Sequence, residues 1–129
     1  MPIRPLVSIV TPTLNQAEYL GRTLGSVRRQ TYPRIEHFVV DGGSTDATLH
    51  VLRAAESSAG MRWVSEPDDG MYDAINKGIS RTTGEIVGYL NSDDLYFPWA
   101  VEAAVRVFES RPGDWGRRRL PVQLRAFRN

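Results

Sequence analysis

Asn91-Ser92-Asp93-Asp94 has the residue types and spacing of a cation site. The cluster follows an apolar run, and its two adjacent carboxylates repel each other unless a positive charge lies nearby. Hard divalent cations take oxygen ligands, and magnesium-type ions often combine one or two carboxylates with the phosphates of a substrate. The pattern therefore predicts a divalent-cation site at Asp93 and Asp94, with an Asp-rich turn or helix cap as the alternative.

A second cluster, Asp41-Gly42-Gly43-Ser44, places an acid after another apolar run. A carboxylate there can accept hydrogen bonds from a ribose or a base, and the glycines allow a ligand to approach the backbone. The alternative is a glycine-rich turn with a helix cap. The sequence contains neither G-x-G-x-x-G nor G-x-x-x-x-G-K-[ST], so a dinucleotide fold or a P-loop nucleotidase has little support.

A third cluster runs over Glu66–Gly78 and contains a second pair of aspartates followed by a predicted helix. Asp73 and Lys77 are four residues apart in that helix, which is typical of a surface ion pair. The functional interpretation instead places Lys77, or the loop at Asp69, beside the phosphates or sugar of a ligand. Both interpretations stay open at this point.

The apolar spacing predicts the elements that must position these clusters. Strands are predicted at residues 6–11, 35–40, 61–65 and 85–90, and helices at about 16–30, 44–57, 71–81 and 99–110. Regular alternation of apolar strands with helices predicts an α/β fold, in which helices cover both faces of a mainly parallel sheet. Ligands of such sheets bind beyond the carboxyl ends of the strands, where Thr13, Asn15, Asp41 and Asp93 would lie.

The composition and charge of the chain indicate a globular domain and exclude some classes of protein. The chain has 129 residues, of which 41% are apolar and 24% charged, values typical of one globular domain. The absence of cysteine excludes a disulfide framework and a cysteine nucleophile. Residues 1–113 carry 11 basic and 14 acidic residues, whereas residues 114–129 carry five arginines and one acid. A basic tail of this kind leaves a nucleic-acid or membrane-surface binder as a lesser alternative.

Four motifs occur in one order and at one spacing: VSIVTPTLN (Val7–Asn15), VVDGGSTD (Val39–Asp46), EPDDGMYDAINKG (Glu66–Gly78) and TGEIVGYLNSDD (Thr83–Asp94). Over about residues 5–113 the chain therefore resembles the family 2 glycosyltransferases, which have the GT-A fold. Each motif alone is weakly specific, but four in register are highly specific.

The resemblance implies a site for a nucleotide-diphospho-sugar donor. The residues that it assigns to the nucleoside pocket are Pro12, Thr13 and Asn15. It assigns Asp41 to the base or ribose, Asp93 to the ribose and diphosphate, and Asp94 to Mn²⁺ or Mg²⁺. The functional interpretation of Asp69 and Lys77 fits the same donor site.

The resemblance also implies an inverting sugar transfer to an acceptor hydroxyl. The third motif is similar to that of bacterial members that build surface polysaccharide, so we expect a glycan or a lipid-linked acceptor. We expect a cytoplasmic location, with peripheral contact at the inner face of the membrane, and we expect no nucleic acid as partner.

Two features depart from the family pattern. Position 14 is Leu, where the family often has an aromatic residue that could stack on a base. No match to the general base, an Asp or Glu, is found, and we expect that residue to be absent from the chain. We therefore divide the chain into an incomplete donor-binding region, 1–113, and a basic tail, 114–129, that an altered reading frame would explain.

These departures leave two further expectations open. A catalytically weak or inactive relic that still binds nucleoside diphosphates is the main alternative function. An incomplete sheet also predicts self-association, because unpaired strand edges and apolar faces would be exposed.

Overall fold

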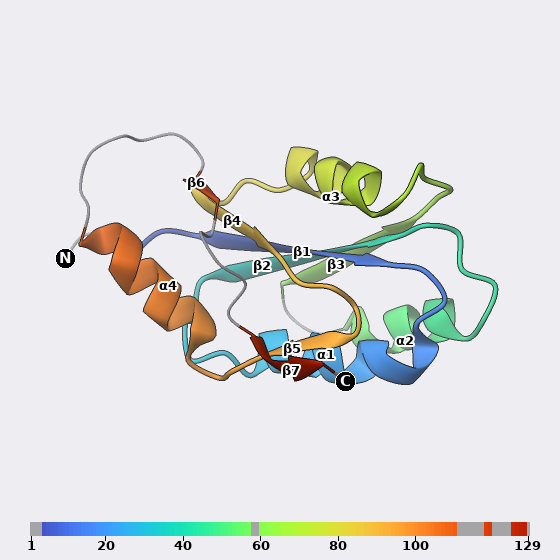
Figure 1. Cartoon of the computed structure of the whole chain (residues 1–129), viewed down its shortest axis with the longest axis horizontal. Coiled ribbons are helices and arrows are strands. Elements are labelled where there is room, and N and C mark those ends of the chain that lie inside the picture. Colours follow the sequence, from blue (N-terminus) through green and yellow to red (C-terminus); the bar gives the residue numbers. More distant parts are fainter. Residues whose placement is uncertain (1–3, 58–59, 111–117, 120–124, 129) are drawn as a thin grey trace.

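The structure is a computed structural model that describes residues 4–57, 60–110, 118–119 and 125–128. Helices and strands alternate along most of the chain (Figure 1). The strands are β1 (Val7–Thr13), β2 (Ile35–Asp41), β3 (Met61–Ser65), β4 (Ile86–Tyr89), β5 (Asp94–Tyr96), β6 (Arg118–Arg119) and β7 (Arg125–Arg128). The helices are α1 (Ala17–Arg28), α2 (Thr48–Ala55), α3 (Met71–Ser80) and α4 (Ala100–Glu109).

The main sheet has the strand order β3-β2-β1-β4-β6, and all of its neighbouring strands are parallel. Helix α3 covers one face, while α1, α2 and α4 lie on the other (Figure 1). The predicted α/β architecture with helices on both faces is therefore confirmed. Because the strands are parallel, the polar segments that follow β1, β2 and β4 all emerge at the same edge of the sheet.

The core lies on both faces of β1 and β2, which are buried over nearly their whole length. Successive side chains of a strand point to opposite faces, so Ile9 joins the core cluster that includes Val101 and Val105 of α4, while Val10 packs in the cluster with Ala74 of α3. Continuous apolar runs are typical of strands that are covered on both faces.

Helix α2 begins later than predicted, at Thr48 rather than at Ser44 or Thr45. The Ser44 hydroxyl donates to the Asp41 carboxylate, and its oxygen accepts a hydrogen bond of 2.8 Å from the Asn15 backbone N–H rather than from the first turn of the helix. The Asp46 Oδ1 atom accepts a hydrogen bond of 2.8 Å from the Thr48 backbone N–H. Asp46, two residues before the helix, therefore provides an acceptor for the first backbone N–H of α2.

Strand β5 lies between the strand predicted at 85–90 and the helix predicted at about 99–110, where the sequence predicts no strand. The strand pairs antiparallel with β7, with Asp94 opposite Arg128. The paired residues lie about 30 residues apart in the chain, so the local sequence pattern does not predict this strand. Strands β6 and β7 both lie within the segment predicted as a basic tail.

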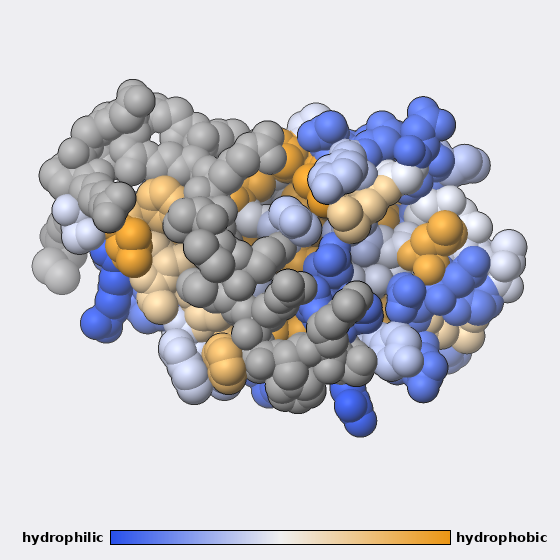
Figure 2. All heavy atoms as spheres, viewed as in Figure 1, coloured by the Kyte–Doolittle hydropathy of each residue, from blue (hydrophilic) through white to orange (hydrophobic). Residues whose placement is uncertain are grey.

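The distribution of hydrophilic and apolar side chains on the surface agrees with a sheet that is covered by helices. Figure 2 shows hydrophilic side chains over α3 and over the end of the molecule where β1 and β2 finish, with apolar residues exposed in small separate patches. Among the described residues, no helix is both long enough and apolar enough to cross a bilayer.

Candidate functional site

A cleft of about 360 Å³ opens at the carboxyl edge of the sheet. Three segments that are distant in sequence form it: the end of β1, the loop before α3 and the loop after β4. The residues that line it are Pro12, Thr13, Leu14, Gln16, Asp68, Gly70, Met71, Ala74, Asn91, Ser92 and Asp93. The cleft lies where the parallel topology predicts a ligand.

Two polar atoms of residues that line the cleft are buried without a hydrogen-bond partner among the described residues. They are the Thr13 hydroxyl oxygen and the Asn91 side-chain oxygen. A buried polar group that has no partner costs about 1–3 kcal/mol, and most such groups in native proteins are satisfied. Two of them in residues of one cleft therefore indicate a polar ligand or bound water.

Asp93 and Asp94 are adjacent in sequence but differ in their burial and in their access to the cleft. Asp93 is half-buried and lines the cleft. Asp94 begins β5, is only 1% exposed and is not among the lining residues. Asp93 thus has direct access to a ligand, and Asp94 lies behind it.

The oxygen atoms of residues that line the cleft suit a hard divalent cation that is also coordinated by a bound ligand. Within the described residues, no group of three or more His, Cys, Asp or Glu side chains is placed to hold a metal by itself. Asp93 supplies a carboxylate, and the Asn91 side-chain oxygen has no hydrogen-bond partner in the part of the chain that the structure describes. Magnesium-type ions are commonly held by one or two carboxylates together with substrate phosphates, and this set matches that pattern.

Asp41 organises the loops around the cleft and does not line it. Its side chain is fully buried at the end of β2. Its Oδ2 atom accepts hydrogen bonds from the backbone N–H of Gly43 and Ser44, at 3.0 and 2.9 Å, and from the Ser65 hydroxyl at 2.7 Å. The Ser44 hydroxyl donates to Oδ1. Both carboxylate oxygens are thus engaged within the protein.

Asn15 joins the loop after β1 to the loop after β2. Its backbone lies in the left-handed region with a φ of 52°, a conformation that Asn tolerates better than most residues. The Asn15 side-chain oxygen accepts hydrogen bonds from the backbone N–H of Thr45 and Asp46, at 2.8 and 3.3 Å. Pro12 and Thr13 line the cleft, whereas Asn15 stabilises the loop after β2, which lies beside it.

The loop before α3 places Asp68, and not Asp69, in the cleft. Asp68 is half-buried and lines the cleft, and its Oδ1 atom accepts a hydrogen bond of 3.0 Å from the Gly70 N–H. It lies so close to Gly42 that a Cβ at that position would be 2.7 Å from Asp68 Oδ2. Asp69 is exposed, and its backbone N–H donates to Asp73 Oδ2 at 3.0 Å.

Lys77 holds this loop in place. Its ammonium donates to the Pro67 carbonyl at 3.1 Å and lies 3.5 Å from Asp73 Oδ2 and 3.6 Å from Glu66 Oε1. The hydrogen bond from the Asp69 N–H, and then the Lys77 charge, lower the pKa of the Asp73 carboxyl. The predicted surface ion pair is therefore present, and the proposed contact of Lys77 with a ligand stays a prediction.

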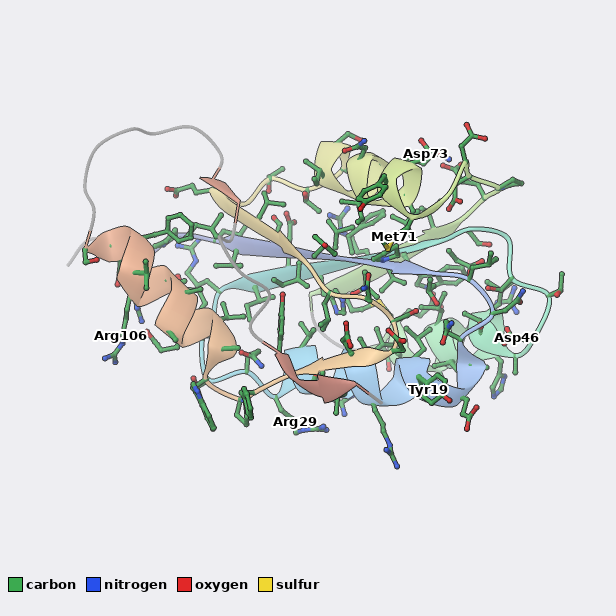
Figure 3. All side chains as sticks on the ribbon, in the orientation of Figure 1. Tyr19, Arg29, Asp46, Met71, Asp73 and Arg106 are labelled. Carbon is green, nitrogen blue, oxygen red and sulfur yellow. The ribbon has the colours of Figure 1, made fainter. Side chains whose placement is uncertain are left out.

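Two apolar side chains border the cleft, of which the sequence pointed to Leu14 only as a departure from the family pattern and did not point to Met71. Leu14 is 51% exposed and Met71 is 41% exposed, although both are large hydrophobic residues. Met71 points from α3 toward the end of β1 (Figure 3). Met71 looks like an ordinary helix residue in the sequence, so only the tertiary structure reveals it. Asp68 could have been found, because it is the other member of a recognised aspartate pair.

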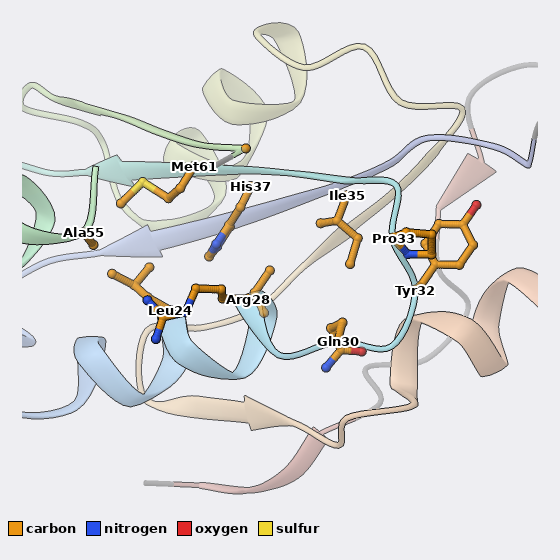
Figure 4. A pocket seen from close by; sticks show the side chains of 11 residues that line it. Leu24, Arg28, Gln30, Tyr32, Pro33, Ile35, His37, Ala55 and Met61 are labelled. Carbon is orange, nitrogen blue, oxygen red and sulfur yellow. The ribbon is translucent and has the colours of Figure 1, made fainter. Parts of the chain in front are cut away.

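A second cavity, of about 190 Å³, lies away from these clusters. It is enclosed by the end of α1 and the first residues of β2 and β3, and His37 points into it (Figure 4). His37 Nε2 lies 2.7 Å from the Thr11 hydroxyl, and burial lowers the pKa of His37 to about 4. The first cleft is therefore the better candidate site, because it combines carboxylates with unsatisfied polar atoms.

The family model described as Glycosyl transferase family 2 matches residues 8–120. The chain belongs to this family. An uncharacterized glycosyltransferase of Mycobacterium tuberculosis is 41% identical over 113 residues, which are 86% of this chain and 43% of that protein. A PGL/p-HBAD biosynthesis glycosyltransferase of Mycobacterium bovis is 39% identical over 114 residues, 85% of this chain and 44% of that protein. The chain thus spans less than half the length of the curated relatives that it matches.

Solved structures of GT-A glycosyltransferases confirm the GT-A fold. Staphylococcus aureus TarS 1–349 in complex with UDP superimposes with a TM-score of 0.75 at 26% identity, over 81% of this chain and 32% of that chain. The mannosyltransferase PcManGT from Pyrobaculum calidifontis, in complex with GDP-Man and Mn²⁺, gives a TM-score of 0.73 at 31% identity, over 85% of this chain and 34% of that chain.

Proposed function

We propose that this chain is the donor-binding part of an inverting glycosyltransferase, with the cleft at the carboxyl edge as the site for a nucleotide-diphospho-sugar. The observation that carries the proposal is the gathering of Asp68, Asp93, Thr13 and Asn91 in one cleft, where the side-chain oxygens of Thr13 and Asn91 are buried without a partner among the described residues. Family membership, and relatives solved with UDP and with GDP-Man and Mn²⁺, support it.

In the proposed reaction the oxygen of an acceptor hydroxyl attacks the anomeric carbon of the sugar. The bond from that carbon to the diphosphate oxygen breaks, and the nucleoside diphosphate leaves with the electron pair. The proton of the acceptor hydroxyl would pass to a general base, an Asp or Glu for which this chain shows no match. Asp93 and Asp94 would hold Mn²⁺ or Mg²⁺, which neutralises charge on a departing diphosphate. The loops that Asp41, Asn15 and Lys77 fix would keep the cleft in shape while the donor binds.

Calorimetric titration of the chain with UDP, GDP and dTDP, in the presence and absence of Mn²⁺, tests the proposal. We expect at least one nucleotide to bind in a manner that depends on Mn²⁺. The substitution Asp93→Asn should weaken that binding about tenfold or more, because it removes a charged contact. Glu85→Gln is the matched control, since it removes one exposed negative charge just before β4, at the other end of the strands.

No binding of any nucleotide, or equal binding by wild type and Asp93→Asn, would overturn the proposal. The assignment of the cation to Asp94 is tested by Asp94→Asn, with thermal unfolding measured alongside because Asp94 is buried. A chain that binds the donor but transfers no sugar to glycan or lipid-linked acceptors would favour the relic alternative.

A further inference from the structure

The turn between β5 and α4 exposes a stacked pair of aromatic rings. The ring centroids of Phe97 and Trp99 are 5.0 Å apart with an interplanar angle of 12°. Phe97 is 39% exposed and Trp99 is 57% exposed, and Pro98 between them is also exposed. A hydrophobic patch is visible in Figure 2 at the place that this turn occupies in Figure 1. Aromatic side chains that are kept at the surface often serve an interaction.

The aromatic turn, residues 97–99, is held firmly against the end of α1. The Gln30 side-chain N–H donates to the Phe97 carbonyl at 2.7 Å, and the Thr31 backbone N–H donates to the Pro98 carbonyl at 2.8 Å. The Gln30 side-chain oxygen also accepts a hydrogen bond of 3.0 Å from the Val101 N–H. The backbone of the turn is therefore fixed before any partner binds, which lowers the entropic cost of binding.

The segment that anchors the aromatic turn is strongly basic. Residues 19–35 contain four arginines and no acidic residue. Arg22, Arg28 and Arg29 are exposed, and Arg22 and Arg29 lie two helical turns apart on one side of α1. Figure 3 shows Arg29 on the outer side of α1, away from the sheet. The acid Glu102 of the adjoining helix is already bonded to Arg4 and Arg106.

We propose that the aromatic turn and the arginines of α1 form a docking surface for an anionic lipid bilayer. Trp and other aromatic rings partition to the bilayer interface, and clustered arginines are attracted to anionic headgroups. The two rings are stacked on each other, an arrangement that suits insertion into an interface better than stacking with separate nucleic-acid bases. This surface is separate from the cleft, and the proposal does not depend on sugar transfer.

Cosedimentation of the full chain with vesicles tests the docking surface. We expect binding to vesicles of phosphatidylcholine mixed with phosphatidylglycerol, and much weaker binding to phosphatidylcholine alone. The double variant Arg22→Gln/Arg29→Gln should reduce partitioning about twenty-five-fold, from about five-fold per arginine near an anionic surface. The matched control is Arg53→Gln/Arg81→Gln, which removes two exposed arginines from other parts of the molecule.

The rings are tested by Phe97→Ser/Trp99→Ser, with Tyr72→Ser as control, because Tyr72 is 74% exposed on α3. The ring variant should lose vesicle binding, and the control should keep it. Equal binding by all variants would overturn the proposal. So would binding lost only in Arg117→Gln/Arg118→Gln/Arg119→Gln, which would assign it to the C-terminal arginines. Retention by DNA without vesicle binding would also contradict the proposal.

Discussion

Asp41 occupies a position where the motif predicts a ligand contact, but its carboxylate forms hydrogen bonds within the protein itself. It lies at the carboxyl end of β2, the edge of the sheet where the sequence predicts it, but its oxygens accept hydrogen bonds from Gly43, Ser44 and Ser65. The residue type and the strand end were visible in the sequence. The partners were not, because Ser65 comes from a strand that is distant in the chain. Its predicted contact with a base or ribose stays a prediction.

Asp68 and Asp69 are adjacent aspartates, of which only Asp68 lines the cleft, so their substitutions can be compared directly. We expect Asp68→Asn to weaken nucleotide binding about tenfold or more, because the substitution removes a charge from the cleft while its side-chain oxygen can still accept from the Gly70 N–H. Asp69→Asn should have little effect, since Asp69 is exposed and does not line the cleft. Parallel calorimetric titrations check both variants, and the reverse order of effects would restore Asp69 as the ligand contact.

His37 makes the stability of the fold depend on pH. Burial lowers the pKa of His37 to about 4 from 6.5, so the folded state binds fewer protons than the unfolded state between these values. Stability is therefore fully present above about pH 6.5 and falls as the pH drops toward 4, by about 3 kcal/mol at most.

Denaturant unfolding of wild type and His37→Gln across this pH range measures the effect. The variant can still form a hydrogen bond with Thr11 but has no imidazole to protonate. The stability difference between the two proteins should change with pH between about 6.5 and 4. Parallel pH profiles for both proteins would show that His37 is not the group responsible.

At the scale of elements, two glycines in helices have opposite surroundings. A Cβ on Gly78 of α3 would lie 2.3 Å from Cγ1 of the buried Val10, so Gly78→Ala should destabilise the fold by about 1–3 kcal/mol. Gly21 of α1 has no neighbouring atom within 4 Å of the same position. Gly21→Ala should therefore stabilise the helix by about 0.5–1 kcal/mol. Thermal unfolding of both variants checks this, and equal effects would argue against close packing of α3 on β1.

The elements differ in how well the sequence predicts them. The strands β1 to β4 and the helices were predicted because apolar periodicity and Pro or Gly boundaries are local signals. The start of α2 was misplaced because the Ser44 oxygen accepts from the Asn15 N–H, and its hydroxyl donates to Asp41, instead of capping the helix. Strand β5 was missed because its pairing with β7 is non-local and its three residues are too few for alternation.

At the scale of the whole molecule, one edge of the main sheet is formed by β3. Backbone groups along a strand edge can pair with another chain. Self-association therefore stays a prediction, and light scattering of the purified chain tests it. We expect a species larger than the monomer, and a monodisperse monomer at high concentration would contradict the prediction.

The central claim is that a nucleoside diphosphate and a divalent cation bind in the cleft at the carboxyl edge of the sheet. Titrating the isotopically labelled chain with UDP, GDP or dTDP in the presence of Mg²⁺, while following backbone amide resonances, tests this claim most directly. We predict that the resonances that shift will cluster in residues 13–16, 68–71 and 91–93. Shifts that gather instead around His37 and the second cavity, or the absence of any shift with all three nucleotides, would contradict it.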